Sequence, residues 1–581
     1  MDDATLCSML KRAAEQADSG YRFLDTREKA IYIGYDKLLE KAVQFAGAFS
    51  RMGIQAEDRI ALILPTCPEF FYVFFGALLI GGIPVPLYPP VRLGRLEEYH
   101  RQTGRMLNIS RARLVVTNKL IKRIIGRSVA KASPDLGIIT VDKIKPAPFA
   151  FTAGKPDALA LIQFSSGTTV DPKPVMLTHR QVIANIQAIL KVILDAYPPE
   201  SYGQYHSGVS WLPLYHDMGL IGCALLAVSR PADLTMIPPE LFVARPAVWL
   251  RAISAYKSFI SPAPNFAYSL CADKIRDKEI EGVDLSHWHI ALNGAEPVTD
   301  ASLEKFIERF APYGFQAHAL TPVYGLSEAA LAVTFSDLKK RFKYKTFDPE
   351  ALLNGRAQIS KHGSNLVSVG KPLPGYQLEI RNQYGENVQE GIIGTLHVKG
   401  PSIMEAYDDN RDATLKILKN GWLNTGDKGF IWEGELYLYG REKDLIIIRG
   451  RNYAPQIIEM ALHHFPGIRK GCVIAAGYVP EGDNCEKLII FCERDKKGDK
   501  SGDKQLAQKA SAEIAGAFAI RPESVIVMEP GTILRTSSGK LRRGPTLNQY
   551  LAGTLAPPKQ VTIFRMAAEM MRSRIALGIT S

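Results

Sequence analysis

The sequence has none of the patterns that indicate a disulfide framework, a cysteine zinc site, a signal peptide or a membrane-spanning segment. Its seven cysteines are an odd number and include no C-x-x-C pair, which argues against a disulfide-bonded scaffold and against a zinc site. The first residues, MDDATLCSMLKRAAEQ, lack the apolar core of a signal peptide. The most apolar run, residues 70–88, is interrupted by paired glycines and by prolines, so it predicts a buried helix followed by a turn. We therefore expect a cytoplasmic protein without a transmembrane segment.

A concentrated block of basic residues is also missing, although the chain is basic overall. Lysine and arginine total 71 against 59 acidic residues, which gives a net charge of +12. This excess attracts anions such as nucleotides, acidic carrier proteins or membranes, and it does not separate them. Because the charges are mixed along the chain, a solvated surface is a better interpretation than a nucleic-acid footprint. We expect no nucleic-acid partner.

The chain of 581 residues is too long for one hydrophobic core, so more than one domain is expected. Short apolar runs such as IALILP and ARLVVT alternate with longer helical stretches, which indicates an α/β fold. Residues 371–439 change to short strands with glycine-rich turns and predict a small β-rich subdomain. A smaller α/β unit follows REKDLIII. We place the boundary near Asp444, between domains of residues 1–443 and 444–581.

Residues 164–173, FSSGTTVDPK, place hydroxyl groups and a glycine in a turn ahead of the helical pattern HRQVIANIQAIL. Such a loop can wrap phosphates, with hydroxyl donors, close backbone approach at the glycine and a lysine charge. The Walker A pattern G-x-x-x-x-G-K-[ST] is absent. A plain Ser/Thr turn is the alternative interpretation. The candidate phosphate contacts are Ser165, Ser166, Gly167, Thr168, Thr169 and Lys173.

Four further segments follow this loop in order: VYGLSEAAL, WLNTGDKGF, LYGREKDLIIIRGRNYAPQIIE and GTILRTSSGKLRR. Over nearly the whole chain, the sequence resembles the adenylate-forming superfamily of acyl-CoA ligases, luciferases and the adenylation domains of peptide synthetases. The resemblance implies a large N-terminal domain of stacked α/β subdomains plus a β-rich subdomain. It also implies a small mobile C-terminal α+β domain, with a hinge at Asp444.

Four other phrases resemble the fatty acyl-AMP ligases more closely: SWLPLYHDMGLIG, SPAPNFAYSLC, ALNGAEPV and IRPESVIVMEPGTILRTSSGK. This resemblance implies activation of a long-chain fatty acid with ATP and Mg²⁺, followed by transfer to the phosphopantetheine of an acyl carrier protein. It also implies that an insertion at about residues 335–366 hampers the domain rotation that acyl-CoA formation needs. The alternative for the insertion is a tolerated surface loop without a function. The alternatives for the activity are a long-chain fatty acyl-CoA ligase and a non-catalytic nucleotide-binding scaffold.

The same resemblance assigns roles to individual residues. Lys540 matches the catalytic lysine that bridges the carboxylate and the α-phosphate. Asp427 matches the acceptor for both ribose hydroxyls, and Arg441 is a second ribose or phosphate contact. Glu328 matches the catalytic carboxylate that holds magnesium together with Thr168.

Other positions would shape the nucleotide and acyl sites. Tyr324 is expected to stack on adenine, opposite a wall of Gly294, Ala295 and Glu296. The adjoining nucleotide positions are Gly325, Leu326 and Ser327. His216 is expected to act between the nucleotide and the acyl pocket. The acyl-pocket candidates are His216, Met218, Ala330 and Leu331.

Two departures and two other patterns complete the prediction. Val170 and Pro174 stand at the glycine positions of the family loop T-G-x-P-K-G, which predicts a stiffer loop. His287 and His289 alternate as in a metal site, but we interpret them as structural. The final stretch FRMAAEMMRSRIAL predicts a basic amphipathic helix, which could dock a carrier or a membrane, and packing against its own domain is the favoured alternative.

Overall fold

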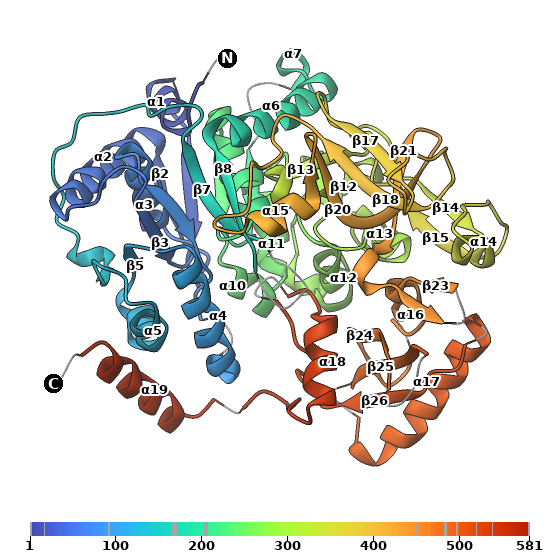
Figure 1. Cartoon of the computed structure of the whole chain (residues 1–581). Coiled ribbons are helices and arrows are strands. Elements are labelled where there is room, and N and C mark those ends of the chain that lie inside the picture. The colour runs from blue at the N-terminus through green and yellow to red at the C-terminus, as the bar shows by residue number, and fades with distance from the viewer. Residues whose placement is uncertain are drawn as a thin grey trace.

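The computed structural model shows a large group of stacked sheets with a smaller α/β group below it (Figure 1). The structure describes residues 3–16, 18–90, 93–165, 172–202, 207–448, 451–463, 465–480, 485–495, 498–518, 520–536, 539–559 and 561–578. Within these residues, no helix is both long and apolar enough to cross a membrane.

The first layer is a parallel sheet in the order β4-β3-β5-β6. Its strands are β3 (Arg59–Ile63), β4 (Ile83–Pro86), β5 (Leu114–Thr117) and β6 (Ile138–Thr140). The apolar run predicted as a buried helix is α3 (Pro68–Leu79), which is buried along most of its length, and a turn then leads into β4. Helix α3 packs closely on α2 (Tyr35–Arg51), because a Cβ at Gly76 would lie 2.9 Å from Phe45 Cβ. The alternation seen in the sequence therefore does form an α/β layer.

Two further sheets build the interior of the large group. One has the order β2-β1-β10-β9 and the other β11-β12-β13-β16. The first contains β1 (Gly20–Leu24), β2 (Ala30–Gly34), β9 (Gly208–Ser210) and β10 (Leu234–Met236). The second contains β11 (Ala291–Asn293), β12 (Leu320–Gly325), β13 (Ala332–Phe335) and β16 (Lys371–Pro372). Single bridges through Ile260 and Ala263 connect the two sheets. The predicted nucleotide residues 294–296 directly follow β11, and Leu326 and Ser327 directly follow β12.

The predicted β-rich subdomain is confirmed as a five-stranded antiparallel sheet. It consists of β17 (Gln377–Arg381), β18 (Gly394–Lys399), β19 (Leu418–Lys419), β20 (Trp422–Trp432) and β21 (Glu435–Arg441). The predicted insertion folds as a hairpin of β14 (Tyr344–Phe347) and β15 (Ser364–Val367) around α14 (Pro349–Leu353). Phe347 is fully buried, with its ring 5.1 Å from that of Phe430. The insertion is thus packed onto this sheet.

The smaller group is built on a three-stranded sheet of β24 (Ile468–Tyr478), β25 (Lys487–Arg494) and β26 (Ser524–Met528). Helices α16 (Pro455–Ala461), α17 (Asp503–Phe518) and α18 (Arg543–Leu551) surround this sheet (Figure 1). Polar contacts join it to the large group, among them the pair of Arg542 with Glu98 at 2.7 Å and the pair of Lys470 with Asp273 at 3.0 Å.

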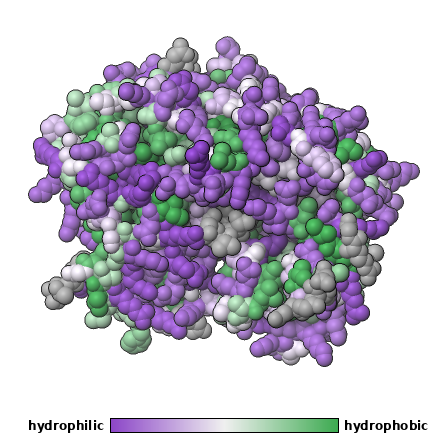
Figure 2. Space-filling model, in the orientation of Figure 1, coloured by the Kyte–Doolittle hydropathy of each residue, from purple (hydrophilic) through white to green (hydrophobic). Residues whose placement is uncertain are grey.

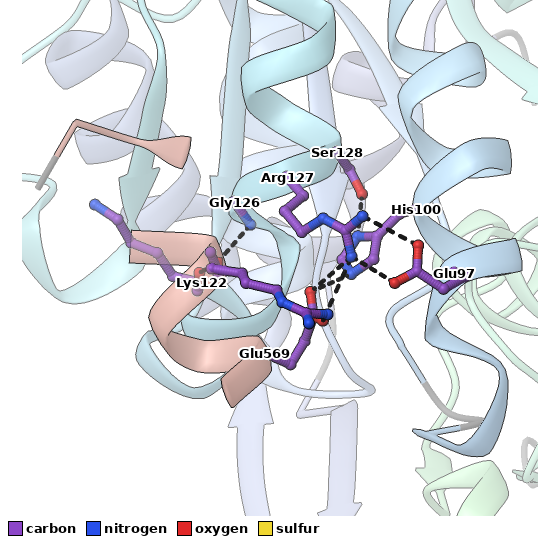
Figure 3. A network of polar contacts seen from close by, with 9 residues as sticks. Glu97, His100, Lys122, Gly126, Arg127, Ser128 and Glu569 are labelled. Atoms are coloured by element: carbon purple, nitrogen blue, oxygen red, sulfur yellow. Dashed lines mark hydrogen bonds and ion pairs between the residues drawn. The ribbon is translucent and has the colours of Figure 1, made fainter. Parts of the chain in front are cut away.

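The last helix, α19 (Ile563–Ala576), does not pack where the sequence interpretation placed it. Instead of packing on the smaller group, it crosses to the far side of the large group (Figure 1) and lies against α5 (Lys119–Ala132). Figure 3 shows the polar contacts that hold it there: Glu569 points toward His100 and Arg127. These long-range contacts could not be read from the amphipathic pattern of the helix alone.

Candidate active site

The predicted phosphate loop connects β7 (Leu159–Phe164) to β8 (Pro174–Thr178), which pair as an antiparallel hairpin. The two ends of the loop are tied together. The Ser165 N–H donates to the Lys173 carbonyl at 2.9 Å, and the Lys173 N–H donates to Ser165 Oγ at 3.3 Å. The candidates Ser166, Gly167, Thr168 and Thr169, and the departure Val170, lie outside the described residues. Pro174 begins β8.

Helix α6 (His179–Ala196) follows this hairpin directly, as the sequence predicted. A capping box starts it: the Gln181 N–H donates to the Thr178 hydroxyl at 3.2 Å, and the Thr178 N–H donates to the Gln181 side chain at 2.9 Å. The end of β8 is therefore fixed to the start of α6.

Lys173 lies beside the second candidate for phosphate chemistry, Glu328. The Lys173 ammonium stands 4.5 Å from the centre of the Tyr407 ring, and the Tyr407 hydroxyl donates to Glu328 Oε1 at 2.6 Å. Burial lowers the pKa of Lys173, and the Glu328 carboxylate opposes that shift. Tyr407 was not predicted from the sequence. It contacts a cation through its ring and a carboxylate through its hydroxyl.

Asp427, Tyr324 and Arg441 form the nucleotide part of the candidate site. Asp427 on β20 is paired in register with Arg441 on β21, and Arg441 Nε donates to Asp427 Oδ1 at 2.9 Å. The Tyr324 hydroxyl, at the end of β12, donates to Asp427 Oδ2 at 2.6 Å. The Asp427 carboxylate is the main cause of the raised pKa of Arg441. Each carboxylate oxygen can still accept another hydrogen bond, so Asp427 is oriented and remains able to bind a diol.

The predicted adenine wall follows β11. Glu296 Oε1 accepts from the Phe266 N–H at 2.5 Å, and Ala295 has a φ of +69°. A Cβ at Gly294 would lie 2.8 Å from Val323 Cγ2, and a Cβ at Gly325 would overlap the Leu331 carbonyl. These two close approaches require glycine.

Lys540 is held on a tight loop of the smaller group. The Thr536 N–H donates to the Lys540 carbonyl at 2.8 Å, and the Lys540 N–H donates to Thr536 Oγ1 at 3.1 Å. This pair of bonds fixes the backbone that carries the lysine. The loop lies next to a cavity of about 520 Å³ between the two groups, where Thr536 faces Ser165 and His216.

Lys540 is half-buried, and its ammonium lies among charged side chains of the large group. Burial lowers its pKa, and the nearby Asp217 carboxylate opposes this shift more than any other group. The other charges that act on it come from Arg441, Glu296 and Asp427. The structure therefore brings together Lys540 and the ribose candidates, which lie about a hundred residues earlier in the sequence.

His216 precedes the short helix α8 (Asp217–Gly219) and is half-buried. Burial lowers the pKa of His216 to about 4, so its imidazole is neutral near pH 7. Its neighbour Asp217 accepts from the Ser327 hydroxyl at 2.5 Å. Asp217 was missed in the sequence interpretation, and the only available signal was its place inside LYHDMG.

An apolar cavity, with about 570 Å³ of empty space including the solvent at its opening, lies between α6, β9, β10 and the helical segment η3 (Leu220–Leu225). Gly222 lines it, and a Cβ there would lie 2.6 Å from Leu331 Cδ2 and 4.0 Å from Met218 Cγ. The predicted pocket residues Met218 and Leu331 therefore adjoin the cavity without lining it, and Ala330 is fully buried. The lining was missed because it combines segments that are distant in sequence.

The histidine pair was interpreted as structural, and His289 packs in an aromatic group with Tyr197 and Phe259. No cluster of three or more His, Cys, Asp or Glu side chains that could hold a metal occurs in the part of the chain that is described.

This fold and this arrangement are those of the adenylate-forming enzymes. The chain belongs to the family of AMP-binding enzymes, whose sequence profile matches residues 10–408. It is 32% identical over 563 residues to a protein of Caulobacter vibrioides described as an acyl-CoA synthetase, covering 95% of this chain and 96% of that protein. It is 30% identical over 581 residues to a medium-chain-fatty-acid–[acyl-carrier-protein] ligase of Moorena producens, with coverage of 95% and 96%.

A solved structure from a study of fatty acyl-adenylate ligases of E. coli and L. pneumophila is 32% identical to this chain. It superposes with a TM-score of 0.88 and covers 95% of this chain and 99% of that one. The resemblance to the fatty acyl-AMP ligases is thus confirmed.

Proposed function

We propose that this enzyme joins a long-chain fatty acid to AMP and then passes the acyl group to the phosphopantetheine of an acyl carrier protein. The observation that carries this proposal is the partial burial of Lys540 beside the nucleotide residues Asp427 and Arg441, close to His216. The names of the relatives in Moorena producens and of the fatty acyl-adenylate ligases support the substrate and the carrier.

In the proposed reaction, a carboxylate oxygen of the acid attacks the α-phosphorus of ATP. A carbon–oxygen–phosphorus anhydride forms, the bond between the α-phosphorus and the bridging oxygen breaks, and pyrophosphate leaves. Both reactants are anionic, so positioning and charge neutralisation supply most of the rate enhancement. Lys540 neutralises charge where the two reactants meet. Asp427 holds the ribose, and Tyr324 packs against the base.

Glu328 fits a role in holding Mg²⁺ with ATP, together with Thr168. Magnesium is commonly held by one or two carboxylates, with its remaining ligands supplied by phosphates and water, so one acidic residue is sufficient. The bound ion would offset phosphate charge. Tyr407 orients the Glu328 carboxylate by its hydrogen bond.

We also propose that residues 1–443 and 444–581 are separate domains with a hinge at Asp444. Asp444 Oδ2 accepts from Arg543 Nη1 at 2.7 Å, next to the proposed boundary. The insertion contacts both sides of it: Phe347 packs in the large group, and Glu350 pairs with Arg451 at 3.2 Å. An insertion that contacts both sides of the boundary resists rotation of the small domain, which supports a carrier protein over coenzyme A as acceptor.

The test supplies labelled dodecanoate and ATP, then adds coenzyme A or a phosphopantetheinylated carrier protein. We expect release of pyrophosphate in both cases and efficient thioester formation only with the carrier. Efficient acyl-CoA formation would support the alternative of an acyl-CoA ligase, which the Caulobacter relative's description favours. Failure to release pyrophosphate with any fatty acid would support a non-catalytic scaffold.

We expect the apolar cavity to receive the acyl chain. Ala227 lines it, so Ala227→Phe should exclude the far end of a long chain. Losing the burial of two or three methylenes costs about 2 kcal/mol, or roughly thirtyfold in kcat/KM for dodecanoate. The kcat/KM for short acids should be unchanged. Steady-state kinetics across a chain-length series measure this, with the exposed Ala255→Phe as control. A uniform change for all lengths would contradict the assignment.

Arg230 is the one charged residue among the described residues that line this cavity. Its Nη1 is buried and has no hydrogen-bond partner within the described chain. Gly222 lies in η3 and Arg230 directly follows the short helix α9 (Leu226–Ser229), so about two helical turns separate these two lining residues. An apolar chain end there leaves a buried donor unpaired, which costs about 1 kcal/mol.

Arg230→Leu should therefore raise kcat/KM for dodecanoate roughly fivefold. The same change should lower kcat/KM for 12-hydroxydodecanoate, whose terminal oxygen can accept from the guanidinium. Paired kinetics with the two acids check the prediction, and Arg230→Lys serves as the control that keeps a donor. If Arg230→Leu changes kcat/KM for both acids alike, the guanidinium has no part in selecting the chain end.

A further inference from the structure

The C-terminal helix α19 carries its apolar side chains on the outside. The residues facing the protein include Glu569 and Ser573, which are 5% and 0% exposed. Ile563, Phe564, Met571 and Ile575 are 86%, 87%, 66% and 69% exposed. Residues 563, 567, 571 and 575 recur every four positions and so form one outward stripe. This is the reverse of the usual burial pattern of a surface helix.

Polar contacts fix the helix in this orientation (Figure 3). Glu569 Oε1 lies 2.9 Å from His100 Nε2 and 3.4 Å from Arg127 Nη1. One turn further, Ser573 Oγ accepts from the Gly126 N–H at 2.7 Å. A Cβ at Gly126 would lie 2.2 Å from the Ser573 carbonyl, so the two helices approach as closely as glycine permits. Rotating α19 to bury its apolar stripe would break all these contacts and bury arginines instead.

The surface around the stripe is basic. Helix α5, against which α19 packs, has the sequence KLIKRIIGRSVAKA, with five basic residues and no acidic one. Two of these five pair with acidic residues of other segments: Lys119 with Asp142, and Arg127 with Glu97 and Glu569. Helix α19 adds Arg565, Arg572 and Arg574, while its single acid, Glu569, is buried. Figure 2 shows apolar residues at the surface at the lower left, where α19 lies in Figure 1. Leu120 on α5 is also 62% exposed.

We propose that this face, the outer side of α19 with the neighbouring basic residues of α5, binds an anionic lipid bilayer. A helix with an apolar stripe flanked by arginines lies in the membrane interface, with its apolar side chains at the acyl boundary. Each basic residue near an anionic surface adds about 1 kcal/mol. Phe564 and Ile563 protrude most, at the start of the helix. A protein partner would satisfy the charges but would not require side chains that protrude so far.

The test uses the full-length protein with sedimented vesicles of phosphatidylcholine alone or mixed with phosphatidylserine. We expect binding to the mixed vesicles, weakened by salt, and little binding to phosphatidylcholine. The double variant Ile563→Ser and Phe564→Ser should bind the mixed vesicles at least roughly tenfold more weakly. Tyr384→Ser, at a side chain that is 79% exposed on another face, is the matched control and should bind normally.

A second variant, Arg565→Glu with Arg574→Glu, tests the charge separately and should lose the preference for phosphatidylserine. Thermal unfolding should be unchanged in both double variants, because the altered side chains are exposed. Vesicle binding equal to wild type in the serine variant would overturn the proposal. So would absence of vesicle binding, or a concentration-dependent dimer that the serine variant abolishes, which would identify a second copy as the occupant.

Discussion

Lys540→Ala is expected to raise the barrier to acyl-adenylate formation by about 3 kcal/mol or more, a loss of more than roughly a hundredfold in rate. This ammonium extends from the smaller group toward the proposed junction and lies close to Asp217, Glu296 and Asp427. Alanine removes the cation and leaves the approach of two anions uncompensated. Single-turnover release of pyrophosphate with dodecanoate and ATP measures the loss.

The pH profile gives an independent readout of the same residue. Burial lowers the pKa of Lys540, and the protonated form is the one that neutralises charge. Wild-type activity should therefore fall as the pH rises through this lowered pKa, and the residual activity of Lys540→Ala should lack that fall. Lys504→Ala, at an exposed position of α17, is the control. Unchanged acyl-adenylate formation by Lys540→Ala would refute the assigned role.

Asp427→Asn is expected to raise KM for ATP roughly thirtyfold, since a charge-assisted hydrogen bond to a hydroxyl contributes about 2 kcal/mol. Asparagine keeps the shape and can still accept from Tyr324, but it removes the charge that Arg441 faces at 2.9 Å. This substitution should change mainly KM for ATP, whereas Lys540→Ala should change mainly kcat.

Initial rates at saturating dodecanoate with varied ATP measure this effect. Asp409→Asn, at an exposed turn residue with a φ of +50°, is a suitable control because asparagine tolerates that conformation. An unchanged KM for ATP, or an equal rise in KM for ATP and for the acid, would show that Asp427 does not bind the ribose.

Much of the local structure was predictable because it depends on neighbouring residues. The apolar run became α3, the Ser/Thr loop connects two paired strands, and the capping pattern of Thr178 and Gln181 starts α6. The pairing of Asp427 with Arg441 also follows from two strands joined by a short turn. In each case, side-chain periodicity, turn residues or caps within a few positions are sufficient.

Other features depend on contacts between distant segments and could not be predicted. Asp217, Tyr407 and Arg230 look ordinary in the sequence, and they gain a role only where Ser327, Glu328 and an apolar cavity lie next to them. The position of α19 was predicted wrongly because an amphipathic pattern does not say which surface offers partners for Glu569 and Ser573.

The sequence of neighbouring residues thus specifies the helices and strands, the fold class and the reactive groups of this enzyme. The partial burial of Lys540, the shape of the apolar cavity and the outward stripe of α19 arise only when remote segments pack together. The physical reason is that burial and electrostatic shifts depend on which groups surround a side chain in space, and sequence separation carries no information about that distance.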